Sequence, residues 1–157
     1  MGERPRILIV DDDESIRKVL VAVLEENEYV VDSAKDGKEA IEKTSRDFYN
    51  LALVDIRLPD IEGTKVIAKM KETTPRMRKI IITGYPSLQN AVDALNKGAD
   101  AYIMKPFDMD KVLQTIKEQL EKQQEEKKYS QERVTEFIET RVNELEEEKP
   151  ITRKEQG

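Results

Sequence analysis

The sequence contains no cysteine and no histidine. Without cysteine, the chain has no disulfide, no thiolate nucleophile and no cysteine metal site. Without histidine, it carries no phosphohistidine and binds no zinc through imidazole. The metal chemistry that remains uses hard oxygen ligands, which suit Mg²⁺ or Mn²⁺.

Long apolar runs and strong net charge are also missing. No run approaches the roughly 20 apolar residues that a membrane-spanning helix needs, and the first residues lack the apolar stretch of a signal peptide. The 27 basic and 33 acidic residues give a formal net charge of −6, which provides no general attraction to nucleic acid or anionic lipid. We therefore expect a cytoplasmic protein that binds neither a membrane nor nucleic acid directly.

Residues 1–120 alternate between short apolar runs, typical of buried strands, and apolar residues at helical spacing. The predicted strands cover residues 7–10, 29–31, 51–54, 80–82 and 101–104. Because a helix pattern follows each strand, we predict an α/β domain with a doubly wound parallel sheet and helices on both faces. Right-handed crossovers leave few strand orders. The flavodoxin-like order 2-1-3-4-5 fits best, since it places the most apolar runs centrally.

The composition changes after Leu120. Residues 121–128 are entirely polar, and Val134, Ile138 and Leu145 then recur at helical spacing. We predict that the last helix of the domain continues as a charged helical extension over residues 121–149, because apolar residues at this spacing form a stripe on a helix.

Pro150 is predicted to end this extension, so we expect residues 150–157 to form a flexible C-terminus. The apolar stripe has three candidate roles: pairing two chains into a homodimer, docking on a partner or on the domain itself, or linking to an output domain. Residues 121–157 hold 11 acids and 8 bases, which does not favour tracking a phosphate backbone.

Polar side chains follow the predicted strands where each one ends: Asp11 and Asp12, Asp55, Thr83 and Lys105. In an open parallel sheet, ligands bind outside the carboxyl ends of the strands, at the point where the winding reverses. Three carboxylates in one crevice repel one another, and a divalent cation removes that conflict. Asp55 is then placed to attack phosphorus, with the ammonium and hydroxyl groups on the phosphoryl oxygens. The sequence thus predicts a Mg²⁺- or Mn²⁺-dependent phosphoryl acceptor.

Four segments carry a family resemblance: residues 7–12, 51–63, 80–83 and 101–107. Together they resemble the CheY-like receiver domain of two-component response regulators. Each motif alone is weak, but their order and spacing over residues 5–120 match the family. The resemblance implies a phosphorylation-controlled switch that acts together with a sensor histidine kinase or a phosphotransfer protein.

The resemblance also implies roles for individual residues. Asp55 matches the phosphoacceptor, which receives the phosphoryl group from a phosphohistidine of the partner kinase. Asp11 and Asp12 match the acidic pair that holds Mg²⁺, and the backbone carbonyl of Arg57 is implied as a further ligand. Lys105 matches the ammonium beside the phosphoryl group. Self-phosphorylation and self-dephosphorylation are the only catalysis implied.

Further positions match the switching part of the family. Thr83 matches the hydroxyl that moves toward the phosphoryl group, and Tyr102 the aromatic residue whose position reports the state. Pro106 matches the proline of a cis peptide. Asp13, the third acid of the first run, is assigned to the start of the following helix. A change in the face built from the fourth helix, fifth strand and fifth helix would carry the signal outward.

Two alternatives remain open from the sequence. Asp11 and Asp13 also fit the Asp-x-Asp motif of haloacid-dehalogenase-like phosphatases, with Asp11 as nucleophile, although this leaves Asp55 without a role. A receiver-like interaction module that no longer takes phosphate is the second alternative. The complete set of site residues argues against it.

Overall fold

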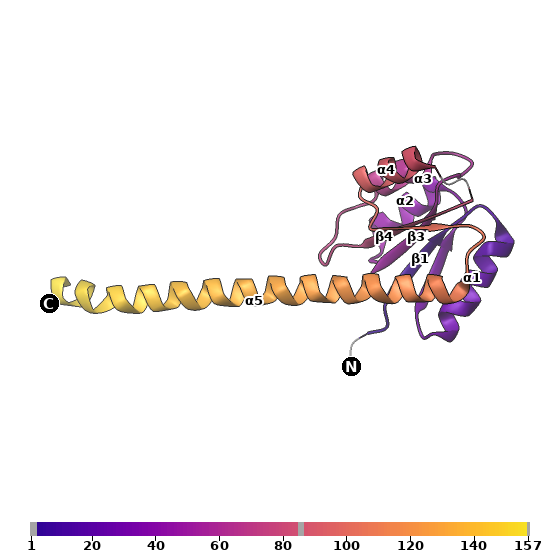
Figure 1. Ribbon diagram of the computed structural model, residues 1–157. Helices are drawn as coiled ribbons and strands as arrows, with labels where there is room; N and C mark the ends of the chain where they lie inside the picture. Colours follow the sequence, from indigo (N-terminus) through magenta and orange to yellow (C-terminus); the bar gives the residue numbers. More distant parts are fainter. Residues whose placement is uncertain (1–2, 85–86, 157) are drawn as a thin grey trace. The chain divides into compact units, whose positions relative to one another are not determined.

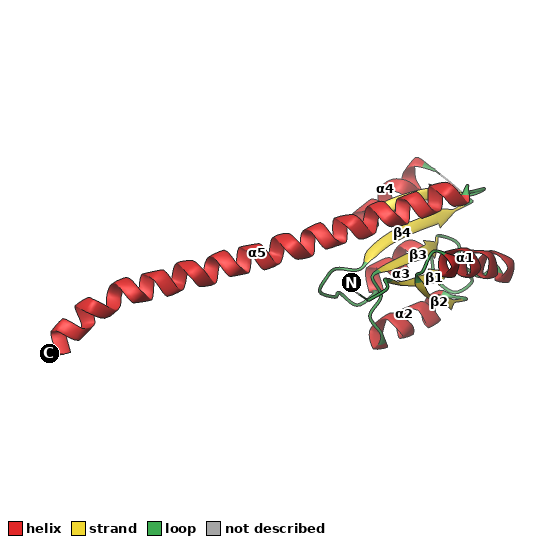
Figure 2. Ribbon diagram, turned by 90° about the horizontal axis from the view of Figure 1, so that it is seen from below, coloured by secondary structure: helices red, strands yellow, loops and turns green. Residues whose placement is uncertain are grey.

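The computed structural model describes the backbone of residues 3–84 and 87–156, and side chains as far as residue 146. Five parallel strands form one sheet (Figure 2) in the order β2-β1-β3-β4-β5. The predicted fold and strand order are therefore confirmed. The strands are β1 (Arg6–Val10), β2 (Val30–Ala34), β3 (Leu51–Asp55), β4 (Arg78–Thr83) and β5 (Ala101–Met104).

Helices cover both faces of this sheet (Figure 1). One apolar cluster joins the sheet to α2, α3 and α4. The other joins it to α1 and the first turns of α5. The helices are α1 (Glu14–Glu26), α2 (Gly37–Arg46), α3 (Gly63–Lys69), α4 (Leu88–Asn96) and α5 (Met109–Gln156). With both faces covered, β1, β3 and β4 are almost entirely buried, as their continuous apolar runs predict.

Strand β4 begins earlier than its apolar run, at Arg78 and Lys79, and both side chains are buried. Asp100, just before β5, accepts hydrogen bonds from Arg76 Nη2 at 2.7 Å, Arg78 Nη1 at 3.1 Å and the Lys79 backbone N–H at 2.9 Å. Asp100 thus pairs with the buried guanidinium of Arg78, while the buried Lys79 ammonium lies 3.9 Å from Glu72 Oε1. A search for apolar runs alone does not find such a strand start.

We expect Asp100→Asn to lower the free energy of unfolding by about 3 kcal/mol at neutral pH, since it removes the charged partner that Asp100 provides to buried Arg78. Burial raises the pKa of Asp100, but the bonds from Arg76 and Lys79 outweigh it and hold the pKa below its ordinary value of 3.8. The stabilisation is therefore present above pH 3.8 and is lost as pH falls through the lowered pKa. Urea unfolding of the unmodified chain and of Asp100→Asn, at pH values above and below 3.8, measures this stabilisation. A difference in unfolding free energy that stays constant with pH would contradict the prediction.

The end of the receiver-like unit lies beyond the predicted boundary. The chain divides into two compact units, residues 1–123 and 124–157. Gln123 is 3% exposed, and its Nε2 donates to the carbonyl oxygens of Asn50 at 2.9 Å and Arg76 at 2.7 Å. A buried amide satisfied by two backbone carbonyls belongs to the folded domain. The expected break at Leu120 is thus too early, because this polar residue carries no apolar signal.

Helix α5 also extends past Pro150, to Gln156, so the prediction that Pro150 ends it is wrong. A proline removes one backbone hydrogen bond and disfavours the preceding turn, but strong helix formers at 146–149 precede it. The expected flexible segment 150–157 is accordingly helical over 150–156, and Gly157 lies outside the described residues.

One further surface, on α4, differs from a simple apolar-inside pattern. On α4, Ala94 is buried, whereas Leu88, Val92 and Leu95 are exposed. Pro86, expected just before this helix, lies outside the described residues. Among the helices that the structure describes, none combines the length and the apolar character that crossing a membrane requires.

Candidate functional site

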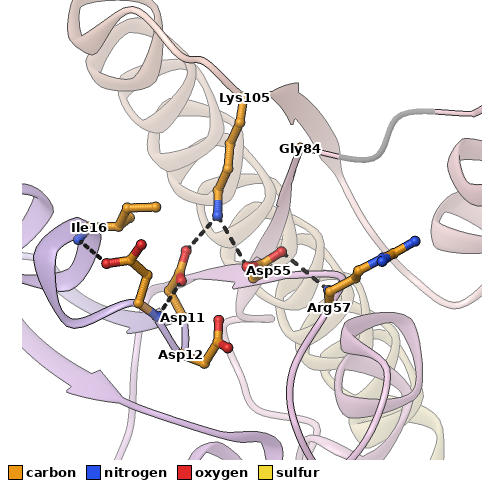
Figure 3. A pocket seen from close by; sticks show the side chains of 8 residues that line it. Asp11, Asp12, Ile16, Asp55, Arg57, Gly84 and Lys105 are labelled. Atoms are coloured by element: carbon orange, nitrogen blue, oxygen red, sulfur yellow. Dashed lines mark hydrogen bonds and ion pairs between the residues drawn. The ribbon is translucent and has the colours of Figure 1, made fainter.

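An open pocket of about 510 Å³ lies at the carboxyl ends of β1, β3 and β5. Figure 3 shows the side chains that surround it. Five of the site residues predicted from the sequence line this pocket, and they come from parts of the chain far apart in sequence: Asp11, Asp12, Asp55, Arg57 and Lys105. Asp13, predicted at the start of the following helix, lines the pocket as well. Parallel strands whose carboxyl ends meet at one edge bring these residues together.

Asp55 occupies the centre of the pocket and is only 6% exposed. Its Oδ1 accepts from the Arg57 backbone N–H at 3.2 Å, and its Oδ2 lies 3.1 Å from Lys105 Nζ. Burial, together with the nearby charge of Asp11, raises the pKa of Asp55, and Lys105 opposes this rise. A buried carboxylate with few hydrogen bonds is a better nucleophile than a solvated one.

Lys105 connects two of the acids in the pocket. Its Nζ donates to Asp11 Oδ2 at 2.9 Å as well as to Asp55 Oδ2, as the dashed lines in Figure 3 mark. Burial alone lowers the pKa of Lys105, but its bond to Asp11 and the charges of both acids outweigh burial and raise it. Lys105 therefore remains a cation at neutral pH and neutralises part of the acidic cluster.

The acidic cluster suits a divalent cation. Carboxylate oxygens of Asp11, Asp12 and Asp55 lie within 4.8 Å of one another. Asp12 is exposed while the other two are buried, so the cluster offers ligands on the pocket floor and at its mouth. Hard oxygen donors at this spacing fit Mg²⁺ or Mn²⁺.

The loop that carries the acidic pair is held by its neighbours. Asp13 caps α1, since its Oδ1 accepts from the backbone N–H of Ser15 and Ile16 at 2.8 and 3.2 Å; this agrees with the helix-start role expected for it. Arg17 Nη1 donates to the Asp11 carbonyl oxygen at 2.7 Å. Sequence reasoning missed Arg17, because an arginine on an amphipathic helix ordinarily faces solvent.

Two predicted residues lie outside the pocket lining. Thr83 is fully buried at the end of β4, and its carbonyl oxygen accepts from the Lys105 backbone N–H at 2.7 Å. Gly84, which sequence reasoning did not select, lines the pocket instead. The expected cis peptide between Lys105 and Pro106 is present.

Tyr102 is half-buried on β5 and packs against the core cluster shared with α4. Its hydroxyl is enclosed and makes no hydrogen bond within the described residues. Burial raises the pKa of Tyr102. The nearby Ser87 backbone lowers it in part, although the Tyr102 hydroxyl makes no hydrogen bond of good geometry within the described residues. An enclosed hydroxyl without a hydrogen-bond partner is costly, and no polar contact within the described residues holds the Tyr102 ring in this position.

The fold and the pocket define a class of protein: a doubly wound domain with an acidic cluster and a lysine at its switch point. The family model for the response regulator receiver domain matches residues 7–117. This chain belongs to that family of two-component signalling proteins, and the resemblance drawn from the sequence is confirmed.

Several characterised relatives agree. The chain is 39% identical over 119 residues to the transcriptional regulatory protein ZraR of Klebsiella oxytoca. The matched region covers 76% of this chain and 27% of ZraR. It is 38% identical over 120 residues to the response regulator ArlR of Staphylococcus saprophyticus, covering 75% and 53%. The chain thus spans from about a quarter to about half the length of these relatives.

Solved structures show the same fold. A CheY-like receiver domain protein from Methanospirillum hungatei is 48% identical, with a TM-score of 0.75, covering 78% of this chain and 98% of that one. The beryllofluoride-activated receiver domain dimer of NtrC4 is 41% identical, with a TM-score of 0.70, covering 75% and 98%. The haloacid-dehalogenase alternative is not supported, because Asp55, which has no role in it, lies beside Asp11.

Proposed function

We propose that Asp55 accepts a phosphoryl group from a phosphohistidine of a partner histidine kinase or phosphotransfer protein. An Asp55 carboxylate oxygen attacks phosphorus, the bond from phosphorus to the donor nitrogen breaks, and its electron pair stays on the donor imidazole. The observation that carries the proposal is the placement of buried Asp55 beside Lys105 and the two other acids. Because this sequence has no histidine, none of its own 157 residues serves as the phosphohistidine donor.

Mg²⁺, or Mn²⁺ in its place, fits the acidic cluster. Asp11, Asp12 and Asp55 would hold it, together with the backbone carbonyl of Arg57, a residue that lines the same pocket. When bound, the cation supplies charge neutralisation to the transferring phosphoryl group. It also relieves the repulsion among three carboxylates in one crevice.

Lys105 and Thr83 have separate roles in this proposal. Lys105 is charged and close to Asp55, so it pairs with the phosphoryl oxygens as a point charge. Thr83, buried behind the pocket on the adjacent strand, moves toward the phosphoryl group and donates a hydrogen bond. Self-dephosphorylation follows when water attacks the same phosphorus: the bond from phosphorus to the Asp55 oxygen breaks, inorganic phosphate leaves, and the Asp55 carboxylate is restored.

The switch is proposed to run from Thr83 to Tyr102. When Thr83 moves inward, the Tyr102 ring takes up the released space, since no hydrogen bond from the described part of the chain holds its hydroxyl. The face formed by α4, β5 and the first turns of α5 then changes. This face already exposes the large apolar side chains Leu88, Val92, Leu95 and Met104, which suits binding to a partner protein.

The test is covalent labelling by acetyl phosphate. With Mg²⁺ present, the intact protein should gain the mass of one phosphoryl group, and peptide mapping should place it on Asp55. Chelating the cation should abolish the gain. Labelling that is independent of the cation, or located on Asp11, would contradict the proposal.

For the C-terminal unit we propose pairing with a second copy of this chain. Five apolar side chains lie exposed in a narrow stripe on the helix, with Phe137 the most exposed at 67%: Val134, Phe137, Ile138, Val142 and Leu145. Burying such a stripe against its own copy removes apolar surface from water. A related receiver domain was solved as an activated dimer, so a domain with this fold can associate with a second copy.

We expect the full chain to sediment as a dimer in the presence of beryllofluoride and Mg²⁺, and Ile138→Asp to sediment as a monomer, because the charge would be buried in the seam. Thr140→Asp is the matched control: it adds the same charge outside the stripe and should remain dimeric. Monomeric full chain with and without beryllofluoride would contradict the pairing.

Nucleic-acid binding is not part of the proposal. Several relatives are named transcriptional regulators, but they are much longer than the matched region. The basic and acidic residues of segment 121–157 nearly balance, with acids in excess. We propose instead that output runs through protein–protein contacts.

A further inference from the structure

Asp60 links two elements next to the pocket. It lies on the loop between β3 and α3, the same loop that carries Arg57. Its Oδ1 accepts from the Gly37 backbone N–H at 2.9 Å, and its Oδ2 accepts from the Lys38 backbone N–H at 2.9 Å. Both donors belong to the first turn of α2, so one carboxylate bridges the loop and the helix.

The helix does not depend on Asp60 alone for its cap. Asp36 precedes α2, and its Oδ1 accepts from the Glu39 backbone N–H at 2.8 Å, as an N-cap residue does. Asp60 satisfies two further N–H groups from another part of the chain. The hydrogen bond from the Gly37 backbone N–H contributes most to holding the pKa of Asp60 below its ordinary value, and the bond from Lys38 adds to it. Asp60 is therefore an anion at neutral pH.

Both ends of the loop are fixed to the end of β3. At its start, the Arg57 backbone N–H donates to Asp55 Oδ1 at 3.2 Å. At its end, the Gly63 backbone N–H donates to the Ile56 carbonyl oxygen at 2.7 Å. The segment between them has to be held by contacts with other elements, or the backbone beside Asp55 is free to move.

The contact with α2 supplies that support. Ile61 packs so closely on the first turn of α2 that a Cβ at Gly37 would lie 2.1 Å from Ile61 Cγ2. Asp60, next to Ile61, adds two hydrogen bonds to the same turn. The middle of the loop is therefore held by one apolar contact and one bridging carboxylate.

We propose that Asp60 is a positioning residue that holds the Arg57 carbonyl in place for the divalent cation by tying its loop to α2. The inference rests on the proposed function, since it concerns the same cation. Asp60 does not itself line the pocket. Groups that orient a metal ligand from outside its coordination sphere typically change metal affinity about 10- to 100-fold when removed.

The experiment compares Asp60→Ala with Asp36→Ala. Each variant removes a carboxylate from the same helix start, but only Asp60 belongs to the loop, so Asp36→Ala is the matched control. Mg²⁺ affinity is measured by calorimetry, without any phosphoryl donor, and thermal unfolding is measured without Mg²⁺. We expect about 10-fold weaker Mg²⁺ binding for Asp60→Ala, and unchanged Mg²⁺ binding for Asp36→Ala despite a lowered Tm.

Asp60→Asn adds a second readout. Its amide keeps one acceptor oxygen but loses the other, so its Mg²⁺ affinity should lie between those of Asp60→Ala and the unmodified chain. If Asp60→Ala binds Mg²⁺ as tightly as the unmodified chain, or if Asp36→Ala loses as much affinity, Asp60 is only a helix cap and the inference is wrong. If the unmodified chain binds no Mg²⁺, or Asp12→Asn binds it equally well, the proposed cation site itself fails.

Discussion

An Asp55→Asn variant is expected to gain no phosphoryl group from acetyl phosphate in the presence of Mg²⁺, a complete loss of labelling. The amide has no carboxylate oxygen with which to attack phosphorus, while its size and position stay the same. The measurement is intact-protein mass with increasing exposure to the donor. The reason for expecting so large an effect is that none of the neighbouring groups replaces Asp55: the Asp11 carboxylate already accepts hydrogen bonds from Lys105 Nζ and from the Asp13 backbone N–H.

Unfolding of Asp55→Asn is not expected to be the cause of its loss of labelling. Burial and Asp11 raise the pKa of Asp55 in the folded protein. A raised pKa means that this group stabilises the fold below its unfolded pKa and that the contribution is lost as pH rises through the folded value. At neutral pH a neutral amide is therefore not expected to lower Tm.

The matched control for this prediction is Asp13→Asn. Asp13 belongs to the same acidic run, and asparagine caps a helix about as well as aspartate. This variant should be labelled normally. Labelling of Asp55→Asn, or equal loss of labelling in both variants, would show that the acceptor is another residue.

Gly63→Ala is expected to destabilise the domain by about 3 kcal/mol and to slow labelling of Asp55. A Cβ at Gly63 would lie 2.0 Å from the Asp55 carbonyl oxygen and 2.9 Å from Ile56 Cα. Both are backbone atoms at the end of β3, so neither can rotate away as a flexible side chain would. The added methyl group therefore forces the loop away from the strand, together with the Arg57 backbone.

Urea unfolding measures the stability change, and the labelling rate by acetyl phosphate measures the effect on the site. Gly84→Ala is the control for stability, because among the described residues its Cβ would meet only the Lys105 side chain, at 3.8 Å or more. Its unfolding free energy should stay close to that of the unmodified chain. A Gly63→Ala protein as stable as that control would mean that the loop does not close on β3 as the structure shows.

Much of the fold follows from local patterns. Apolar runs such as 51–54 are long enough to be buried on both sides of a sheet, and helix patterns separate them. Because parallel strands require crossovers of one hand, alternation alone restricted the order of strands to a few choices. The structure has the order favoured from apolar content.

The sequence was less informative where polar side chains are buried. Lys79 is 4% exposed inside β4, and its Nζ donates to the Ile67 carbonyl oxygen at 3.4 Å. Gln123 is buried in a stretch that reads as solvated. Conversely, Leu88 and Leu95 have an apolar character but face outward on α4. Burial of a polar group depends on partners supplied by distant segments, which no local pattern reveals.

By itself, the sequence determined the fold class, the family and the chemical types at the strand ends, because each of these depends on residue type and spacing along the chain. Only the tertiary structure decided which groups touch. It placed Lys105 between Asp11 and Asp55, put Thr83 behind the pocket wall, and joined Asp60 to α2. The physical reason is that hydrogen bonds require atoms within about 3 Å, and that separation is set by packing between elements far apart in sequence.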